Sequence, residues 1–237
     1  MNIAIPSAKI DLGITDANQQ WIITAYTLAF GSLLLLGGRI GDYMGRKKIF
    51  LIGLMGFAAA SALGGIASNQ ELLFAARALQ GVFAALLAPA ALSIISVTFT
   101  VPAERAKAFG VIGAISGGGA AIGLILGGAL TEYFSWRWCL GVNTPIAIGA
   151  AILAIKFVRE SKAQGDNTYD IPGVITATAG LFALTYGFHE AATKGWSSSL
   201  TIGFLVSAVF LLAIFVAIEK RVANPLMPLR VVTDRNR

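Results

Sequence analysis

Seven long apolar runs constrain what this chain can fold into more than any other feature. They lie at residues 20–41, 48–68, 71–98, 106–131, 138–158, 172–190 and 199–218. A helix needs about 20 mainly apolar residues to cross the hydrocarbon of a bilayer. Only helices satisfy their own backbone polar groups in lipid, and the strands of a membrane barrel would appear as short alternating segments. The sequence therefore predicts an all-α integral membrane bundle with about seven transmembrane helices.

The content of charged residues points to the same class of protein. Only 13% of the residues are charged and 56% are hydrophobic, whereas soluble domains carry about 25% charged residues. Once the seven runs are removed, no stretch remains that is long enough to build a soluble core. The chain is therefore expected to be a membrane protein without a separate soluble domain.

The basic residues predict how the helices are oriented. Suppose that the connection at residues 42–48 is cytoplasmic and that the connections alternate from there. Fourteen of the eighteen Lys and Arg residues then fall inside and three fall outside, with Arg77 within a run. Excess Lys and Arg on short cytoplasmic connections is the usual orientation signal. It also accounts for the net charge of +6 without a nucleic-acid partner.

The connection between the first two runs has an unusual composition. Residues 37–50 read GGRIGDYMGRKKIF. The glycines let helices approach closely, and Asp42 can bond a helix N-terminus or a nearby arginine. A basic membrane anchor would explain the cations but neither the glycines nor Asp42. We call Gly38, Asp42, Gly45, Arg46 and Lys47 the gate loop, a role that the family resemblance described below implies.

Arg77 is a charged residue inside a membrane run. It lies about six residues into the third run, about 9 Å along a helix, and a buried guanidinium is costly and keeps its proton. Gln80 follows at i+3 and shares its helix face, and Tyr26 of the first run could line the same cavity. Two interpretations stay open. Arg77 is either a fixed cation in a transport cavity or a structural arginine that bonds carbonyl groups of a neighbouring helix.

Glycines are concentrated in the fourth run. Gly119, Gly123 and Gly127 repeat at i+4, and Gly128 follows them. Small residues at this spacing let another helix pack closely. We predict that these glycines form a helix-packing face, and the family resemblance described below implies that two halves of the protein rock across it.

Several ordered motifs together resemble the major facilitator superfamily of transporters. The gate loop is similar to the family pattern G-x-x-x-D-x-x-G-R-K, and Arg77, Gln80 and Gly81 are similar to R-x-x-Q-G. Residues 135–145 resemble S-W-R-W-x-x-x-x-N-x-P, and residues 170–187 and 218–231 resemble the extra pair of spans of one branch. The resemblance covers the whole chain and is strongest to the fourteen-span drug/proton antiporters of the EmrB/QacA type.

The resemblance implies a function and a site. It implies proton-driven export of lipophilic or cationic small molecules across the cell membrane by alternating access. Arg77 would take part in proton coupling, and Asp42 would lock the cytoplasmic gate with Arg105 as its partner. Residues 1–160 would form an amino-terminal bundle that lacks most of its first span, residues 161–220 the linker pair, and residues 221–237 a cytoplasmic segment. A missing carboxy-terminal bundle would follow, so the chain is expected to be truncated at both ends.

One departure from the family pattern leaves the mode of transport open. The fourth run resembles G-x-x-x-G-P-x-x-G-G, but Leu124 stands in place of the proline that is associated with exchangers. An uptake symporter or a uniporter of the same fold is therefore an alternative. A truncated membrane fragment that does not transport and serves as an interaction scaffold is another.

No catalytic or metal-binding pattern is found in the sequence. Cys139 is the only cysteine and His189 the only histidine, so neither a disulfide nor a metal site of thiolates or paired histidines is expected. Walker sequences and nucleophile elbows are missing. We therefore expect no cofactor, no metal and no enzymatic activity, with protons, membrane lipid and a small-molecule substrate as the partners.

Overall fold

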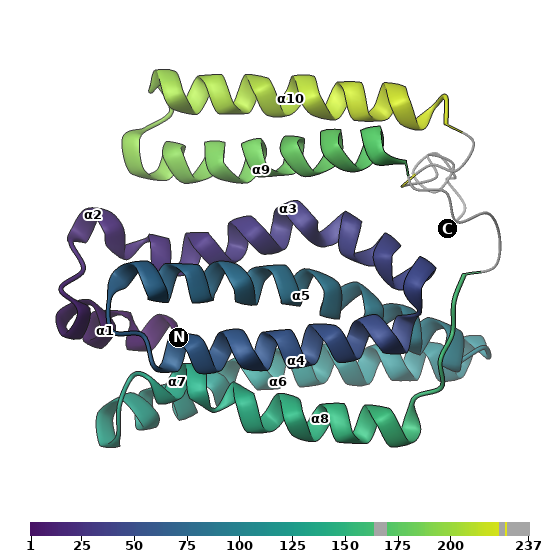
Figure 1. The fold of residues 1–237 in the computed structure, drawn as a ribbon, viewed down its shortest axis with the longest axis horizontal. Helices are drawn as coiled ribbons and strands as arrows, with labels where there is room; N and C mark the ends of the chain where they lie inside the picture. The colour runs from purple at the N-terminus through teal and green to yellow at the C-terminus, as the bar shows by residue number, and fades with distance from the viewer. Residues whose placement is uncertain (164–169, 223–225, 227–237) are drawn as a thin grey trace.

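A computed structural model describes residues 1–163, 170–222 and 226, and over these residues the chain is helical without any strand (Figure 1). Four short elements are η1 (Asn2–Ala4), α1 (Ile5–Leu12), α2 (Asp16–Gln19) and α7 (Trp138–Gly141). The long helices are α3 (Trp21–Met44), α4 (Arg46–Gly65), α5 (Gln70–Thr98), α6 (Pro102–Tyr133), α8 (Asn143–Phe157), α9 (Ile171–Lys194) and α10 (Ser199–Glu219).

All seven predicted spans are confirmed as helices. Within the described residues, seven helical segments are long and apolar enough to cross a membrane. Each corresponds to one of the seven apolar runs, with α7 and α8 together forming the fifth. Helix α6 begins at Pro102 and ends at Tyr133, and so extends beyond both ends of the apolar run 106–131. The protein is therefore a multi-pass membrane protein of the all-α class.

The expected loop between the first two spans is almost absent. Helix α3 continues through the glycine-rich stretch to Met44, and α4 begins at Arg46. Only Gly45 lies outside a helix, with φ 115° and ψ 127°. A residue with a Cβ rarely adopts such a positive φ, so glycine allows one residue to reverse the chain. The glycines before Gly45 continue α3, so the connection between the two spans is a single residue.

Helices α3, α4 and α5 form the centre of the structure (Figure 1). Helix α5 packs against both α3 and α4, while α8 covers α4, and α9 packs between α3 and α10. The contact between α3 and α5 is very close, because a Cβ placed on Gly37 would lie 2.0 Å from the carbonyl oxygen of Ala85. Any residue with a Cβ would clash at this point, so Gly37 fixes where the two helices cross.

Helix α6 contrasts with this centre. Gly127 is the only buried residue of α6. The helix makes its main contacts with η1, α7 and α5. A Cβ placed on Gly119, Gly123 or Gly128 would meet no atom of the described residues within 4 Å. The predicted packing role of these glycines therefore has no counterpart among the described residues and stays a prediction.

The alternating helices give the bundle two different ends. We call the end that holds residues 44–46, 98–102, 157–163 and 219–221 the basic end; in Figure 1 it carries the connection from α3 to α4 and the end of α10. This end collects the connections that the sequence placed in the cytoplasm. Most of the segment 221–237 lies outside the described residues.

The opposite end is held by one carboxylate. Asp11, in the last turn of α1, accepts hydrogen bonds from the Arg137 guanidinium and, at 3.0 Å, from the Trp136 indole. Arg137 also donates to the carbonyl oxygen of Ala67 at 2.8 Å, between α4 and α5. The bond from Arg137, and then that from Trp136, lowers the pKa of the Asp11 carboxyl below its ordinary value. This ion pair joins the start of the chain to two later connections.

Candidate functional site

Arg77 in α5 is held by three contacts from two helices. Its Nε donates to the carbonyl oxygen of Ile22 at 2.8 Å, and its Nη1 donates to Oε1 of Gln80 at 2.7 Å. Its Cζ lies 4.6 Å from the centre of the Tyr26 ring, within the range of a cation–π interaction. The bond to the Ile22 carbonyl fits the interpretation of Arg77 as a structural residue. Its position in the cavity described below fits the interpretation as a fixed cation.

Gln80 extends this arrangement into α4. Its side chain is only 1% exposed, and its Nε2 donates to Oγ of Ser61 at 2.7 Å. A buried amide without partners would be costly, so both contacts stabilise one orientation of Gln80. Gln80 in turn orients Arg77. Ser61 was not predicted, because a single serine in an apolar run gives no signal of a contact nineteen residues away.

The charge of Arg77 is not balanced by a carboxylate among the described residues. None of the ion pairs in this part of the chain includes Arg77, and its partners are a carbonyl, an amide and a ring. A desolvated cation with only neutral partners strongly favours a nearby anion. The arrangement can therefore hold an anionic group or lower the proton affinity of a carboxylate that comes close.

These residues line a cavity of about 460 Å³. Its polar lining includes Tyr26, Arg77, Gln80 and Asn143, and most of the rest is apolar. Gly119, Gly123 and Gly127 of α6 line it as well, so the structure brings the predicted cavity residues and most of the predicted glycine set together. Asn143 was missed as a site residue, although it is the asparagine of the N-x-P pattern at the start of α8.

A mainly apolar cavity with a few polar groups suits an amphipathic molecule. The apolar walls can accept hydrocarbon or aromatic groups, and the polar residues can orient a hydrogen-bonding group. No three side chains of the His, Cys, Asp and Glu types meet in the described residues in a way that could hold a metal ion. The chemistry that this cavity supports is binding and charge compensation.

The second predicted site, the gate loop, contains an ion pair. Arg46 donates to Oδ1 of Asp42 from Nε at 3.0 Å and from Nη2 at 2.7 Å. The expected partner, Arg105, is exposed and donates to the carbonyl oxygen of Phe99 at 2.9 Å. The pairing of Asp42 with Arg105 is therefore not found. Asp42 pairs with Arg46 and not with Arg105, because the one-residue break at Gly45 brings the start of α4 next to the last turn of α3.

The structure adds Glu160 to this site. Its carboxylate accepts the backbone N–H groups of Lys47 at 3.1 Å and Lys48 at 3.0 Å. These N–H groups belong to the first turn of α4, which has no helical partners for them and carries the positive end of the helix dipole. Glu160 therefore caps α4 from a distant part of the chain.

Gly45 is required by this cap as well as by its backbone angle. A Cβ on Gly45 would lie 2.8 Å from the Glu160 carboxyl group, closer than real Cβ contacts. The position of an acid between Arg159 and Lys162 was the available signal for Glu160. Nothing in the sequence indicated that its partners would be main-chain groups.

Three more hydrogen bonds fasten the end of α8 and the segment after it to the gate loop. Arg46 N donates to Ser161 O at 2.9 Å, and Ala163 N donates to Asp42 O at 3.0 Å. The Nζ of Lys47 donates to the carbonyl oxygen of Ile155 at 2.8 Å, in the last turn of α8. The gate loop and residues 155–163 are therefore held as one unit at the basic end.

Comparison with known proteins identifies related sequences over the whole chain. Residues 1–230 match the profile of the Major Facilitator Superfamily. A puromycin resistance protein of Streptomyces alboniger is 53% identical over 237 residues, which are 100% of this chain and 47% of the relative. A cephamycin export protein of Amycolatopsis lactamdurans is 39% identical over 98% of this chain and 48% of its own length.

A tetracenomycin C resistance and export protein of Streptomyces glaucescens is 34% identical over 96% of this chain and 42% of its own length. The chain thus spans about half the length of the curated relatives that it matches. The match to each relative includes nearly all of the residues described above.

Proposed function

Because this chain belongs to the Major Facilitator Superfamily, we propose that it works in the export of drug-like small molecules across the cell membrane by alternating access. The observation that carries the proposal is the mainly apolar cavity in which Arg77 is fixed by Ile22, Gln80 and Tyr26. The names of the relatives refer to resistance and export, which supports transport out of the cell.

The substrate class follows from the cavity. Its lining combines apolar side chains with Tyr26, Gln80 and Asn143, which can accept or donate hydrogen bonds. We propose lipophilic substrates with a polar or cationic group. Arg77 would repel a substrate cation directly beside it, so the cationic group would lie toward the aromatic and amide groups.

Proton coupling is proposed from the unbalanced charge of Arg77. A carboxylate that approaches the guanidinium would lose its proton more readily, because an opposite charge favours the charged form. Movement of such a carboxylate toward and away from Arg77 would release and take up a proton in each cycle. The fixed guanidinium supplies the charge and keeps its own proton throughout.

The basic end would be the cytoplasmic gate. Gly38, Asp42, Gly45, Arg46 and Lys47 would form its moving contact, with Arg105 in the neighbouring connection. We propose that Gly119, Gly123, Gly127 and Gly128 meet a second bundle of helices during the cycle. Residues 1–160 would then form the first bundle, and residues 161–220 would form the linker pair.

Efflux of a fluorescent cationic dye tests this proposal, in cells that lack their own exporters. We expect Arg77→Ala to reduce proton-driven efflux at least about tenfold, since it removes one charge-assisted contact worth about 1.5–3 kcal/mol and leaves Oε1 of Gln80 without its donor. Arg77→Lys should restore little, because lysine lacks the planar fork that reaches two acceptors. Lys107→Ala, at an exposed position, serves as the control.

Three outcomes would contradict parts of the proposal. Normal efflux by Arg77→Ala would make Arg77 a structural residue. Dye accumulation in place of efflux would favour an uptake symporter or a uniporter. If the purified chain moved no dye in proteoliposomes with an imposed pH gradient, transport by this chain alone would be refuted and the interaction-scaffold alternative favoured.

A further inference from the structure

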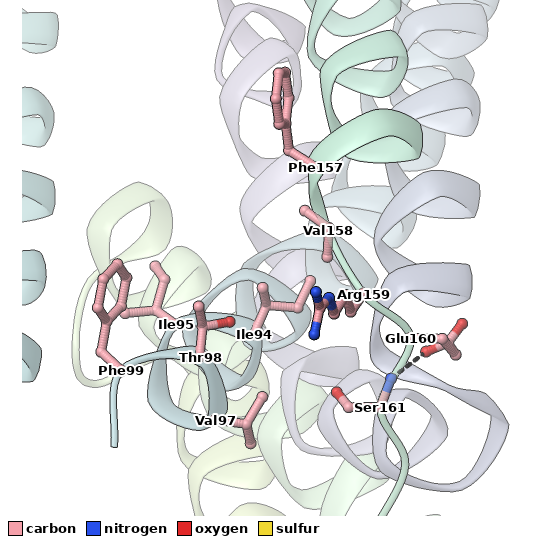
Figure 2. A pocket seen from close by; sticks show the side chains of 10 residues that line it. All are labelled: Ile94, Ile95, Val97, Thr98, Phe99, Phe157, Val158, Arg159, Glu160 and Ser161. Carbon is pink, nitrogen blue, oxygen red and sulfur yellow. Dashed lines mark hydrogen bonds between the residues drawn. The ribbon is translucent and has the colours of Figure 1, made fainter. Parts of the chain in front are cut away.

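A second pocket lies at the basic end, away from Arg77, and shares no lining residue with the first cavity. Its volume is about 560 Å³. One wall is the last turn of α5 and the residues after it, and the other is the segment that follows α8 (Figure 2). The lining residues are Ile94, Ile95, Val97, Thr98, Phe99, Phe157, Val158, Arg159, Glu160 and Ser161.

Two adjacent charged residues of the second wall, Arg159 and Glu160, direct their side chains to opposite sides of the segment (Figure 2). Figure 2 shows Arg159 on the side of Ile94, whereas the Glu160 carboxylate lies on the far side of the segment. The negative charge of Glu160 is engaged by the N–H groups of Lys47 and Lys48. Arg159 is exposed and has no hydrogen bond or ion pair with any described residue. The pocket therefore holds one cation whose charge is not compensated.

The rest of the pocket is suited to hydrocarbon. Phe157 is 69% exposed, Val97 41% and Phe99 37%, although all three are large apolar residues. The pocket lies where α5 and α8 end, which in a membrane helix is the level of the lipid headgroups. Exposed apolar groups near an unpaired guanidinium match the division of a lipid into acyl chains and headgroup.

Two hydroxyl groups add polar capacity beside Arg159. Thr98 ends α5 and lines the pocket, and in Figure 2 its hydroxyl is directed toward the Ile94 and Arg159 side. Oγ of Ser161 is buried and has no hydrogen-bond partner among the described residues. Hydroxyls beside a guanidinium are typical partners of phosphate oxygens.

We propose that this pocket binds an anionic phospholipid, with its phosphate at Arg159 and Thr98 and an acyl chain along Phe157 and Ile94. A free phosphate ion would leave the apolar walls uncovered. A zwitterionic lipid would bring its own cation close to Arg159 and lose part of the attraction. The bound lipid would join the end of α5 to the segment whose Glu160 caps α4. This inference does not depend on what the protein transports.

The experiment uses the purified chain in nanodiscs that contain a photoreactive phosphatidylglycerol or a photoreactive phosphatidylcholine at equal mole fraction. After illumination, mass spectrometry identifies the labelled peptides. We expect phosphatidylglycerol to label residues 94–99 and 157–161 about tenfold more than phosphatidylcholine does, the effect of one charge-assisted contact. Inorganic phosphate added in excess should not compete, because it cannot use the apolar walls.

The second part of the experiment compares variants that lose the same charge inside and outside the pocket. Arg159→Gln should reduce labelling by phosphatidylglycerol about tenfold, while Lys162→Gln, which removes the same charge three residues away and outside the pocket, should reduce it about twofold. Arg159→Lys should keep most of it, because a lysine still attracts phosphate as a point charge. Equal labelling by both lipids, equal losses in the two Gln variants, or competition by inorganic phosphate would each overturn the proposal.

Discussion

The crossing of α3 with α5 and the face of α6 both contain glycines, and the surroundings of these glycines are opposite. A Cβ on Gly37 or Gly81 would lie 2.0 Å or 2.4 Å from a backbone oxygen of the other helix. On Gly119 or Gly123 it would meet nothing within 4 Å among the described residues. Glycine spacing therefore tells where a close approach is possible, and only packing tells whether the chain makes that approach within itself.

The largest loss of stability is expected for Gly37→Ala, which tests this comparison most directly. The new methyl group would overlap the carbonyl oxygen of Ala85 at 2.0 Å, and a helix backbone cannot move away alone. We expect a loss of about 3 kcal/mol, the upper part of the usual range for overpacking. Thermal unfolding in detergent measures it. The matched control is Gly38→Ala, whose Cβ would lie at an ordinary 3.5 Å from Pro89; equal losses for the two variants would refute the packing argument.

The next largest effect is expected for Gly45→Ala. An alanine at φ 115° is strained, and its Cβ would lie 2.8 Å from the Glu160 carboxyl group. Strain of this kind costs about 1–3 kcal/mol, so we expect a loss of about 2 kcal/mol in thermal unfolding.

Glu160→Ala divides this effect into two parts. It removes the crowding but also the cap, for which a loss of about 1 kcal/mol is typical. In the double variant the two losses should not add, because both substitutions act on one contact. Strict additivity would show that Gly45 is needed for its backbone angle alone.

A smaller effect is expected for Gly56→Ala in α4. Its Cβ would lie 2.2 Å from the ring of Phe83, but a side chain can change its rotamer where a backbone cannot. We expect a loss of about 1 kcal/mol, the lower part of the overpacking range. Gly56→Ala combined with Phe83→Leu should recover part of it in the same unfolding assay. A loss as large as that of Gly37→Ala would mean that α4 is as rigidly placed as the α3–α5 crossing.

The smallest effect is expected for Gly123→Ala in α6. Nothing lies near its Cβ position, and alanine favours a helix over glycine by up to about 1 kcal/mol. The thermal midpoint of the purified chain should therefore stay the same or rise slightly. In the dye efflux assay the same variant should lower transport, since Gly123 lines the cavity and is proposed to meet a second bundle. A clear fall in the midpoint would show that α6 packs more closely than the structure describes.

The spans and the Arg77–Gln80 contact could be predicted because both are local. Seven apolar runs report the thickness of the bilayer directly, and the confirmed helices differ from them mainly at their ends. Arg77 and Gln80 are three residues apart, so helix geometry alone brings them together.

Other parts of the candidate site depend on the tertiary structure. Ser61 meets Gln80 only because α4 packs on α5, and Asn143 reaches the cavity through the position of α8. Arg105 was expected on Asp42, and the one-residue turn at Gly45 gives that place to Arg46. Glu160 binds main-chain N–H groups, which every residue type except proline provides, so no side-chain pattern could reveal it.

The cap that Glu160 provides also has a consequence for the order of events during synthesis. The carboxylate and the N–H group of Lys47 are 113 residues apart in the chain. At a translation rate of about 5–20 residues per second, α4 would leave the ribosome on the order of ten seconds before its cap exists. During this interval the first turn of α4 has to satisfy its N–H groups with water, so we expect it to remain at the membrane surface. The arrival of Glu160 then fixes the start of α4 after α5, α6, α7 and α8 have been made but before α9 and α10.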